Sequence, residues 1–530
     1  MQNIRHMPIG VQDFPTMKEG NYVYVDKTGF IPKLELVGRA YFLSRPRRFG
    51  KSLFISTLQA YFEGRAELFK GLFIEKYKAE RGEEWKSYPI LKLDLNAKEY
   101  TKEEHLKTIL NDHINEWYKK YDIPLDAKDP DSAFATIIKE LYEKFNKKVV
   151  ILIDEYDKPL IATLENEELQ GKYRATLKAF YSVIKSLNGC IHMSFLTGVT
   201  KFSKVSIFSD LNNLDDISFD TEYSSICGIT EEELLRYFSP EVKILAEDNT
   251  ISYEDMLDVL RRKYDGYRFS KNEERLYNPF SLLNALEKKE VGNYWFATGT
   301  PTFIVQLMEQ RAFDIPDLEG NIELSMSDID DYRITYDNLA PLLFQAGYLT
   351  IKGYNKSDRT YILGYPNDEV KYALLKNLMK VYTSAGGREG KFRISLFKNA
   401  MIKGDIDEVL TLIKALMASI PYDNLPSDKL FLREHNYQTS IYLIFLLMGE
   451  YVKTEVHSSK GRSDVEVETD NAIYIFEFKV GGGPADAIAQ IKKANYADKH
   501  ASSSKSIFLI GATISRNKRT LGRWTIEKLI

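Results

Sequence analysis

Short apolar runs alternate with amphipathic stretches from Tyr41 to about Phe219. Continuous apolar runs of this length are typical of strands buried on both faces, and the stretches between them repeat their apolar residues with helical spacing. The alternation predicts an α/β domain with a parallel sheet. The expected strands are AYFLS (40–44), ILKLDL (90–95), VVILID (149–154) and IHMSFLTG (191–198).

The pattern changes near residue 230. From there to about residue 310 the spacing is mostly helical, and the first helix opens with Thr230 and Glu233 in the spacing of a capping box. Residues 337–351 predict a helix that runs into a strand, residues 360–366 predict the returning strand, and a helix follows. This order is typical of a winged helix, and a generic small α+β unit has the same pattern.

The last part of the chain predicts a small mixed sheet with helices. Helical spacing extends from about residue 394 to Met448, and strand patterns then dominate. The expected strands are VKTEVHS (452–458), SDVEVET (463–469), AIYIFEFK (472–479) and SIFLIGAT (506–513), with one helix over 486–500.

Composition narrows the class of protein without identifying it. The 530 residues suffice for three or four domains, and 44% hydrophobic and 28% charged residues are ordinary for a globular chain. The apolar runs are too short to span a bilayer, and the first ten residues contain no apolar segment of a signal peptide. Cys190 and Cys227 have no metal-ligand spacing and indicate neither a zinc site nor a disulfide framework. We therefore expect a cytoplasmic protein with no membrane partner.

Residues 41–58, YFLSRPRRFGKSLFISTL, contain an apolar run, a Gly-Lys-Ser turn and an amphipathic helix. This order is typical of a phosphate-binding P-loop, in which backbone N–H groups surround the phosphates. Lys51 would then reach the β- and γ-phosphates, and Ser52 would ligate Mg²⁺. Arg45 departs from the general motif, which has a glycine at that position. The tripeptide alone favours a plain strand, turn and helix.

The run VVILIDEYDKP (149–159) strengthens the nucleotide interpretation. It ends in Asp154 and Glu155, about 100 residues after the GKS. Asp154 would orient Mg²⁺ through water, and Glu155 would position or deprotonate the attacking water. The run alone is compatible with a strand that ends in a solvated acidic loop. The two motifs in this order favour an NTP site.

Other side chains near these motifs could contact a phosphate. Thr197 ends the run IHMSFLTG and could sit beside the γ-phosphate as a sensor, or could simply cap a turn. Five cationic residues could place their charge near the phosphates: Arg47, Arg48, Lys201, Lys204 and Arg236.

The run AIYIFEFK places an acid and a base on one face of an apolar strand. Side chains alternate along a strand, so Glu477 and Lys479 share a face with Ile475. Asp464 lies 13 residues before Glu477, and TDNA (469–472) is a turn signal, so the two acids can meet across a hairpin. Converging carboxylates repel each other unless a cation such as Mg²⁺ or Mn²⁺ neutralises them, and a neighbouring lysine can assist phosphodiester hydrolysis. A bare Glu-x-Lys instead favours a salt-bridged strand face.

Roughly residues 410–530 resemble the PD-(D/E)xK nuclease superfamily. The resemblance rests on the spacing of Asp464, Glu477 and Lys479, together with an acid on the preceding helix and a glutamine on the following one. It implies an αβββαβ core in which the Asp and Glu bind a metal and the Lys assists hydrolysis. The auxiliary residues that it suggests are Glu434, Glu455 and Gln490.

Roughly residues 1–300 resemble the AAA-ATPase-like family that is found beside such nuclease domains. Arg45 matches this family, and its members are mostly predicted bacterial proteins. The matching stretches are YVDKTGFI (24–31), FLSRPRRFGKS (42–52), LIDEYDKPL (152–160), GVTKFSKVSIFSDLNNLDDIS (198–218), YDGYRF (264–269) and YNPFSLLNAL (277–286).

The hydrophobic patterns and the two resemblances together predict an α/β protein of four parts, although residues 300–400 carry no family motif. These are a P-loop AAA-ATPase-like core (1–229), a helical lid (230–325), a winged-helix-like region (326–400) and a restriction-endonuclease-like α/β domain of the PD-(D/E)xK type (401–530). The expected cofactors are ATP and Mg²⁺, with Mn²⁺ also suited to the nuclease-like site. Nucleotide-binding candidates are Arg47, Arg48, Phe49, Gly50, Lys51, Ser52, Asp154 and Thr197. Catalytic candidates are Glu155, Asp464, Glu477 and Lys479, and metal-ligand candidates are Ser52, Asp154, Glu434, Asp464 and Glu477.

The leading interpretation is an ATPase that regulates or positions a metal-dependent nuclease. We expect nucleic acid as the partner, with DNA and RNA both open, and we leave a homo-oligomer open. Residues 499–530 contain seven Lys and Arg residues and one acid. This basic tail could bind along a phosphate backbone or be a solvated strand. The alternative is a nucleotide-switched module that binds nucleic acid or protein through a catalytically silent nuclease-like fold.

Overall fold

The computed structural model divides into two compact units. The first unit comprises Met1–Trp295 and Gly320–Asn367, and the second comprises Phe296–Glu319 and Asp368–Ile530. The four-part division expected from the sequence is finer and stays a prediction. The structure describes the chain except for residues 1–5, 38–39, 97–98, 125–128, 165, 202–212, 296–303, 306, 309–312, 314, 331–338, 385–393, 420–440, 450–452, 460–461, 481, 494–499, 501–502, 516–519 and 530.

A parallel sheet with the strand order β2-β3-β4-β1-β5 forms the centre of the first unit. Its strands are β1 (Ala40–Ser44), β2 (Ile90–Asp94), β3 (Val149–Asp154), β4 (Ile191–Gly198) and β5 (Leu214–Asp216). The first four confirm the predicted strands, whereas β5 has only three residues and gives no recognisable pattern. Because β4 pairs with both β1 and β3, the carboxyl ends of these three strands meet at one edge of the sheet.

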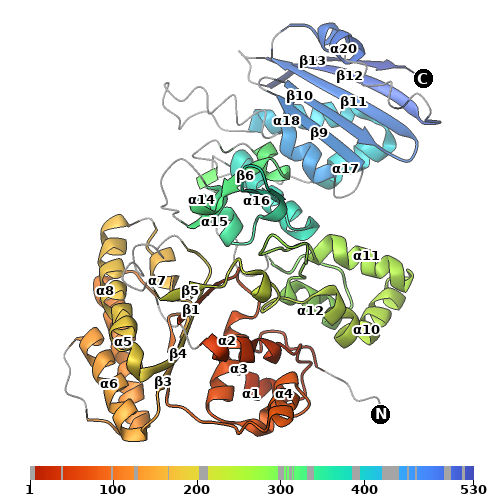
Figure 1. Ribbon diagram of the computed structural model, residues 1–530. Helices are drawn as coiled ribbons and strands as arrows, with labels where there is room; N and C mark the ends of the chain where they lie inside the picture. Colours follow the sequence, from red (N-terminus) through yellow and green to blue (C-terminus); the bar gives the residue numbers. More distant parts are fainter. Residues whose placement is uncertain are drawn as a thin grey trace. The chain divides into compact units, whose positions relative to one another are not determined.

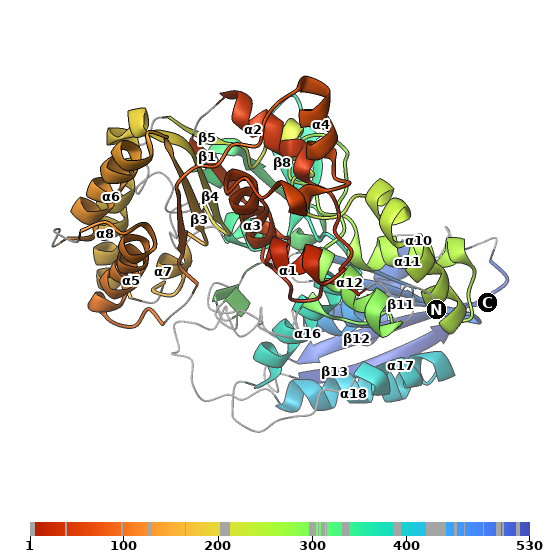
Figure 2. The same ribbon diagram turned by 90° about the horizontal axis from the view of Figure 1, so that it is seen from below.

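Helices cover both faces of this sheet, which explains why its strands are continuously apolar. α3 (Lys51–Phe62) lies on one face, and α5 (Glu103–Tyr121), α6 (Pro130–Phe145) and α8 (Glu167–Ser186) lie together on the other (Figures 1 and 2). The shorter helices of this part are α1 (Phe14–Glu19), α2 (Ile31–Val37), α4 (Phe73–Arg81) and α7 (Lys158–Ile161). Single 3₁₀ turns are η1 (Thr28–Phe30), η2 (Ala66–Phe69), η3 (Asn188–Cys190) and η4 (Thr221–Tyr223).

Three helices follow the sheet, in the range that we predict to be the lid, and they share a hydrophobic core. They are α10 (Glu231–Asp248), α11 (Tyr253–Tyr264) and α12 (Pro279–Lys288). α10 begins at the predicted capping box: Glu233 N donates to Thr230 Oγ1, and Thr230 N donates to Glu233 Oε2. These bonds satisfy two N–H groups that the first turn of a helix leaves open.

The first unit is completed by a small antiparallel sheet in the order β6-β8-β7. Its elements are β6 (Ile322–Ser325), α14 (Met326–Asp330), α15 (Ala340–Gln345), β7 (Thr350–Asn355) and β8 (Thr360–Gly364). The predicted order of helix, strand, strand and helix is confirmed, and the last helix, α16 (Asp368–Ser384), belongs to the second unit. The winged-helix interpretation of this order stays a prediction.

The second unit contains a mixed sheet in the order β13-β12-β11-β10-β9. Its strands are β9 (Lys453–Ser459), β10 (Arg462–Glu468), β11 (Ala472–Val480), β12 (Ser506–Ser515) and β13 (Thr520–Lys528). β11 and β12 are parallel, and the other neighbours are antiparallel. The final part of the basic tail is therefore an edge strand, β13, paired with β12. For β9 and residues 462–464 the backbone alone is described.

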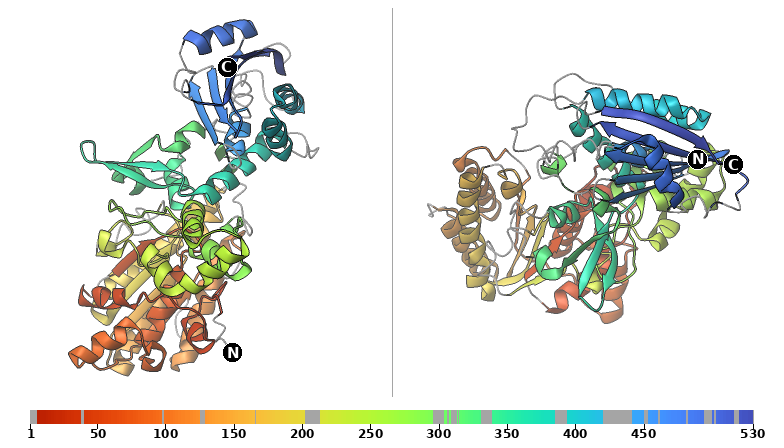
Figure 3. Two further views of the ribbon diagram at one scale, coloured as in Figure 1. Left: turned by 90° about the vertical axis from the view of Figure 1, so that its right-hand side faces the viewer. Right: turned by 90° about the horizontal axis from the view of Figure 1, so that it is seen from above.

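Helices pack on both faces of the second sheet (Figures 1 and 3). Ile488 and Ile491 of α20 (Pro484–Lys493) pack in a buried cluster with Ile475 of β11. On the opposite face, the ring of Phe445 in the helical residues 441–448 lies 5.0 Å from that of Phe476. The remaining helices of this unit are η6 (Ile315–Glu319), α17 (Ile394–Lys403) and α18 (Ile406–Ser419).

No helix in the described ranges combines the length and the apolar character that crossing a membrane requires.

Candidate functional site

The loop between β1 and α3 has the backbone of a phosphate-binding turn. Arg48 and Gly50 adopt left-handed conformations, with φ of 67° and 96°. Gly50 immediately precedes α3, so the open N–H groups of the first helical turn border the loop. Lys51 Nζ donates to the carbonyl oxygens of Arg45 and Pro46 at 2.9 and 3.0 Å. An anion in this loop would therefore meet helix N–H groups and an ammonium group together.

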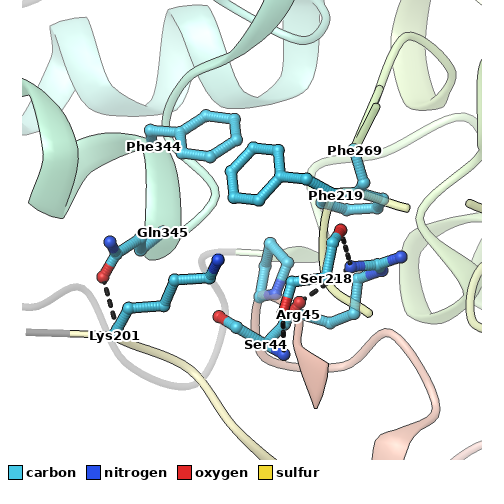
Figure 4. A pocket seen from close by; sticks show the side chains of 9 residues that line it. Ser44, Arg45, Lys201, Ser218, Phe219, Phe269, Phe344 and Gln345 are labelled. Atoms are coloured by element: carbon cyan, nitrogen blue, oxygen red, sulfur yellow. Dashed lines mark hydrogen bonds between the residues drawn. The ribbon is translucent and has the colours of Figure 1, made fainter. Parts of the chain in front are cut away.

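Arg45 is a structural anchor of this loop. Its backbone is not in the left-handed region, so the side chain is tolerated where the general motif has glycine. The buried guanidinium donates to Ser218 O at 2.8 Å and lies over the ring of Phe269 (Figure 4). It also donates to Tyr223 O at 3.0 Å. Burial lowers the pKa of Arg45 to about 10. The start of the loop is thus fixed to segments more than 170 residues away in sequence.

The three residues that follow Pro46 lie in different surroundings. Arg47 is exposed. Arg48 donates to Trp295 O at 2.6 Å and lies over the ring of Phe280, so its side chain contacts the lid. Phe49 is buried, with its ring 4.7 Å from that of Tyr267. Of these three, the structure places Arg48 and Phe49 in packing contacts beside the loop.

The carboxyl end of β3 faces the P-loop. Thr197, at the end of β4, donates from Oγ1 to Asp154 Oδ1 at 2.6 Å. Glu155 has a φ of 53°, a sparsely populated conformation for a residue with a side chain. Burial raises the pKa of Glu155, and the nearby Lys51 ammonium opposes this increase. The structure thus brings Lys51, Asp154, Glu155 and Thr197 together.

This edge of the sheet also fits Mg²⁺. Asp154 is 4% exposed, and Ser52 lies in the first turn of α3. A carboxylate and a hydroxyl are oxygen donors that Mg²⁺ accepts beside phosphate. These two residues would hold the ion.

The other cationic candidates do not all lie at the loop. Lys201 Nζ forms an ion pair with Asp216 Oδ2 at 2.7 Å and lies over the ring of Phe219. Arg236 is exposed on α10, 5.3 Å from the ring centroid of Tyr237. Lys204 lies outside the described residues.

An apolar pocket of about 80 Å³ adjoins Gly50. The N-terminal segment contributes Tyr24 to its lining, and the lid contributes Phe238 and Leu283. Sequence reasoning missed this pocket because its walls come from segments more than 200 residues apart, and the motifs in those segments do not show that they meet.

In the second unit, the pairing of β10 with β11 places Asp464 directly opposite Glu477. Residues directly opposite each other on paired strands lie on one face of the sheet. Glu477 is fully buried, and Lys479 Nζ donates to Asp486 O of α20 at 3.1 Å. The predicted hairpin register is therefore present.

The first turn of α20 approaches the sheet beside Glu477. Gly511 of β12 is the neighbour of Glu477, and a Cβ at Gly511 would lie 2.3 Å from Pro484 O. Only glycine permits this approach. Glu477 thus occupies a closed position between β10 and the start of α20.

The register places Asp464 opposite Glu477, and a divalent cation between two such carboxylates would remove their repulsion. Asp464 and Glu477 would hold it. Among the described side chains, no group of three or more His, Cys, Asp and Glu residues is arranged to hold a metal ion. The side chain of Asp464 is not among the described ones. The auxiliary candidate Glu434 lies outside the described residues, Glu455 lies on β9, and Gln490 is half-buried on α20.

Comparison with known proteins matches two families, one in each half of the chain. Residues 8–208 match the family described as a predicted AAA-ATPase, and residues 432–524 match the PD-(D/E)XK nuclease superfamily. A protein from Azotobacter chroococcum mcd 1, described as an uncharacterized protein in the vnfD 5′ region, is 36% identical over 530 residues, covering 99% of both chains. The chain belongs to this predicted AAA-ATPase family with a C-terminal PD-(D/E)XK nuclease domain. The expected P-loop core and nuclease-like sheet are confirmed.

Within the AAA-ATPase-like core, Asp157 is a buried residue that sequence reasoning missed. Its Oδ2 accepts bonds from the N–H and the hydroxyl of Thr200, both at 2.6 Å. Burial raises the pKa of Asp157, and these hydrogen bonds oppose the increase. The last acid of the motif DEYD was the signal that could have identified it.

Within the nuclease domain, His457 of β9 lies directly opposite Asp464. The register therefore places His457, Asp464 and Glu477 in one row across three strands. The alternation of VKTEVHS with SDVEVE could have revealed this row, because the strands are joined by a short turn.

Proposed function

We propose that the protein binds ATP with Mg²⁺, hydrolyses it, and uses the bound nucleotide to regulate or position a metal-dependent phosphodiesterase in its second unit. The observation that carries the proposal is the convergence of Lys51, Asp154, Glu155 and Thr197 at one edge of the parallel sheet. The nuclease half rests on the register of Asp464 with Glu477.

ATP would lie across the loop that ends at Gly50. Its phosphates would meet the N-terminus of α3 and Lys51, and its base would enter the apolar pocket beside Gly50, where Tyr24 and Phe238 are exposed to the cavity. Bound Mg²⁺ would neutralise the negative charge that develops on the transferred phosphate. Asp154 and Ser52 would bind the ion.

Glu155 would act as the general base or as the residue that positions the attacking water. Burial moves its pKa upward from the ordinary range, which makes the carboxylate a better proton acceptor. Thr197 would hold Asp154 and contact the terminal phosphate, since its hydroxyl already lies 2.6 Å from the Asp154 carboxylate.

In the second unit, Asp464 and Glu477 would hold Mg²⁺ or Mn²⁺, and the ion would supply a more acidic bound water. Lys479 would stabilise the negative charge that develops on the phosphodiester. The basic tail offers part of its charge to a nucleic-acid backbone, although Lys505 already pairs with Glu468 at 3.0 Å.

One observation favours the alternative, a catalytically silent binding module. Glu477 is fully buried and would have to become accessible before a phosphodiester could react, and half-exposed Lys479 would have to exchange its bond to Asp486 O for one to the substrate. In this alternative the nuclease-like sheet binds nucleic acid or protein, and nucleotide switches the binding.

Nucleotide binding and turnover test the first half of the proposal. Lys51→Ala removes the ammonium group at the loop and should abolish binding of a fluorescent ATP analogue. Glu155→Gln should bind the analogue like the parent and lose phosphate release. Lys107→Ala removes an exposed lysine of α5 and should leave analogue binding and phosphate release unchanged. Unchanged binding and turnover in Lys51→Ala and Glu155→Gln would show that the nucleotide site is wrongly assigned.

A further inference from the structure

Buried hydrogen bonds tie the loop after β4 to the acidic end of β3. Asp157 Oδ2 accepts from Val199 N at 3.1 Å and from Thr200 N at 2.6 Å. Tyr156 adds a bond from its hydroxyl to Thr200 O at 2.8 Å. Asp154 and Glu155 immediately precede Tyr156 and Asp157. The loop that follows Thr197 is therefore bound to the motif that carries the proposed catalytic acids.

The next residue of this loop continues the series into α15. Lys201 N donates to Gln345 Oε1 at 2.7 Å (Figure 4). Gln345 Nε2 in turn donates to Ile329 O of α14 at 3.0 Å. Gln345 is 5% exposed, so both bonds are shielded from water. One buried amide thus joins the nucleotide-facing loop to the small antiparallel sheet region.

The cavity beside these residues is too small for a ligand. Figure 4 shows it between Arg45, Lys201, Phe344 and Gln345, and its volume is about 20 Å³. That volume accommodates about one water molecule. The arrangement therefore serves contact between elements, with little room for the side chains to change position independently.

A second link runs from the P-loop through the motif YDGYRF. The guanidinium carbon of Arg45 lies 4.2 Å from the ring centroid of Phe269, and the ring of Phe49 lies 4.7 Å from that of Tyr267. The Tyr267 hydroxyl donates to Gly347 O, just before β7, at 3.0 Å. This motif thus contacts the P-loop on one side and the approach to β7 on the other.

The same motif holds β7 and the end of β8. Arg268 N donates to Thr350 Oγ1 at 2.7 Å, and Thr350 Oγ1 donates to Arg268 O at 3.2 Å. Gly266 has a φ of 106°, and a Cβ there would lie 2.2 Å from Pro366 O. The backbone contact between these two segments therefore requires glycine at position 266.

Residues 320–367, which we call the transmission segment, have a distinctive place in the chain. The described residues of this segment pack within the first unit, yet the stretches on either side, up to Glu319 and from Asp368 onward, belong to the second unit. The segment is therefore joined covalently to the second unit at both ends. A displacement of the segment acts directly on the polypeptide of the nuclease-bearing unit.

We propose that the transmission segment reads the nucleotide state of the P-loop site and passes it to the nuclease unit, with Gln345 as the positioning residue. The inference rests on the proposed function, because it requires a triphosphate at Lys51 and Thr197. A terminal phosphate beside Thr197 changes the position of the loop at residues 198–201. Because close-packed, hydrogen-bonded interiors transmit small shifts, Lys201 N moves Gln345 and α15 with it.

Hydrogen exchange in the full chain tests this inference. Binding of a fluorescent ATP analogue is measured first, and exchange is then compared with ADP and with a slowly hydrolysed ATP analogue, both with Mg²⁺. In the parent, the triphosphate should slow exchange of amides in residues 340–352 on the order of tenfold relative to ADP. Gln345→Ala should bind nucleotide like the parent and lose this difference.

Two variants separate transmission from a merely structural role. Gln345→Glu keeps an acceptor for Lys201 N but cannot donate to Ile329 O, so part of the nucleotide difference should return. Gln170→Ala removes another amide that donates to a backbone carbonyl, that of Leu160, and should keep the whole difference. A structural role alone lowers the unfolding temperature of Gln345→Ala and leaves the nucleotide difference intact.

The outcomes are distinguishable. A parent that binds the triphosphate without a change at residues 340–352, or a Gln345→Ala variant that keeps the full change, overturns transmission and leaves the ATP site standing. A parent that binds no nucleotide overturns both proposals. If Gln345→Ala does not fold, the test rests on Gln345→Glu. Full retention of the nucleotide-dependent exchange difference in Gln345→Glu would show that the bond from Gln345 to Ile329 O does not transmit the nucleotide state.

Discussion

Arg45 and Phe269 form a buried stack, with 4.2 Å between the guanidinium carbon and the ring centroid. The arginine replaces the first glycine of the general P-loop motif, and the phenylalanine ends YDGYRF, a motif that follows the second lid helix. The contact shows how this chain holds its phosphate loop: a side chain attaches the loop to neighbouring segments, where the general motif uses glycine for backbone freedom.

Restoring the general motif at this position should harm the protein. Arg45→Gly leaves the carbonyl oxygens of Ser218 and Tyr223 buried without their donor and should lower the free energy of unfolding by about 2–4 kcal/mol. Arg45→Lys should recover part of the loss, because lysine keeps the charge but not the planar fork. Urea unfolding measures the effect, with exposed Arg47→Ala as a control expected to change little. A parent-like midpoint for Arg45→Gly would refute the anchoring role.

The native Glu155 should lower the stability of the folded chain while being required for ATP hydrolysis. Its φ of 53° strains any residue that has a Cβ, so Glu155→Gly should raise the free energy of unfolding by about 1 kcal/mol while abolishing ATP hydrolysis. Lys289→Gly is a matched control, because Lys289 also has a φ of 53° and lies at the end of α12, away from the site. It should gain similar stability and keep full hydrolysis. Loss of stability in Glu155→Gly would contradict the strain argument.

Asp265 should give the stability of the first unit a distinct pH dependence. Burial raises its pKa from 3.8 to about 6 in the folded chain. Between these values the folded state binds more protons than the unfolded state, so stability falls as pH rises through this window. Asp265→Asn removes the buried charge and should be more stable than the parent above pH 6, by about 1–3 kcal/mol.

The difference in unfolding free energy between Asp265→Asn and the parent should therefore shrink as the pH falls. Near pH 4 the parent carboxyl is neutral in the folded state, and the two unfolding free energies should agree. Urea titrations between pH 4 and pH 8 measure this. A constant difference across that range would show that Asp265 does not titrate near 6.

The sequence carried enough information for the elements but not for their long-range partners. β3 is readable because its residues are continuously apolar up to Asp154, and the pairing of Asp464 with Glu477 follows from strand alternation and one short turn. The bond from Lys201 N to Gln345 joins residues 144 positions apart and leaves no local pattern. The apolar pocket beside Gly50 likewise depends on long-range contacts, because its walls come from four separated stretches, within residues 8–27, 49–57, 226–238 and 279–283.

Metal binding in the second unit should require both Asp464 and Glu477. Removing one of two opposed carboxylates leaves the other unable to hold the ion alone, so Asp464→Ala and Glu477→Ala should each lose Mn²⁺ binding, and the double change should add little. Lys479→Ala should bind Mn²⁺ like the parent, because Lys479 acts on the phosphodiester and not on the ion. Isothermal titration with Mn²⁺ checks this. Equal Mn²⁺ affinity in the parent and in Glu477→Ala would exclude Glu477 as a ligand.

Single-turnover cleavage of labelled single- and double-stranded DNA and RNA with Mn²⁺, with and without ATP, tests the central claim most directly. The account predicts that the parent cleaves at least one substrate at a rate that changes with ATP, and that Glu477→Ala cleaves at least on the order of a hundredfold more slowly. Lys51→Ala should cleave at the rate of the nucleotide-free parent whether or not ATP is present. Glu527→Ala, which removes a partly exposed acid of β13, should behave like the parent. Cleavage by Glu477→Ala at the parental rate, or an undiminished ATP effect in Lys51→Ala, would contradict the account.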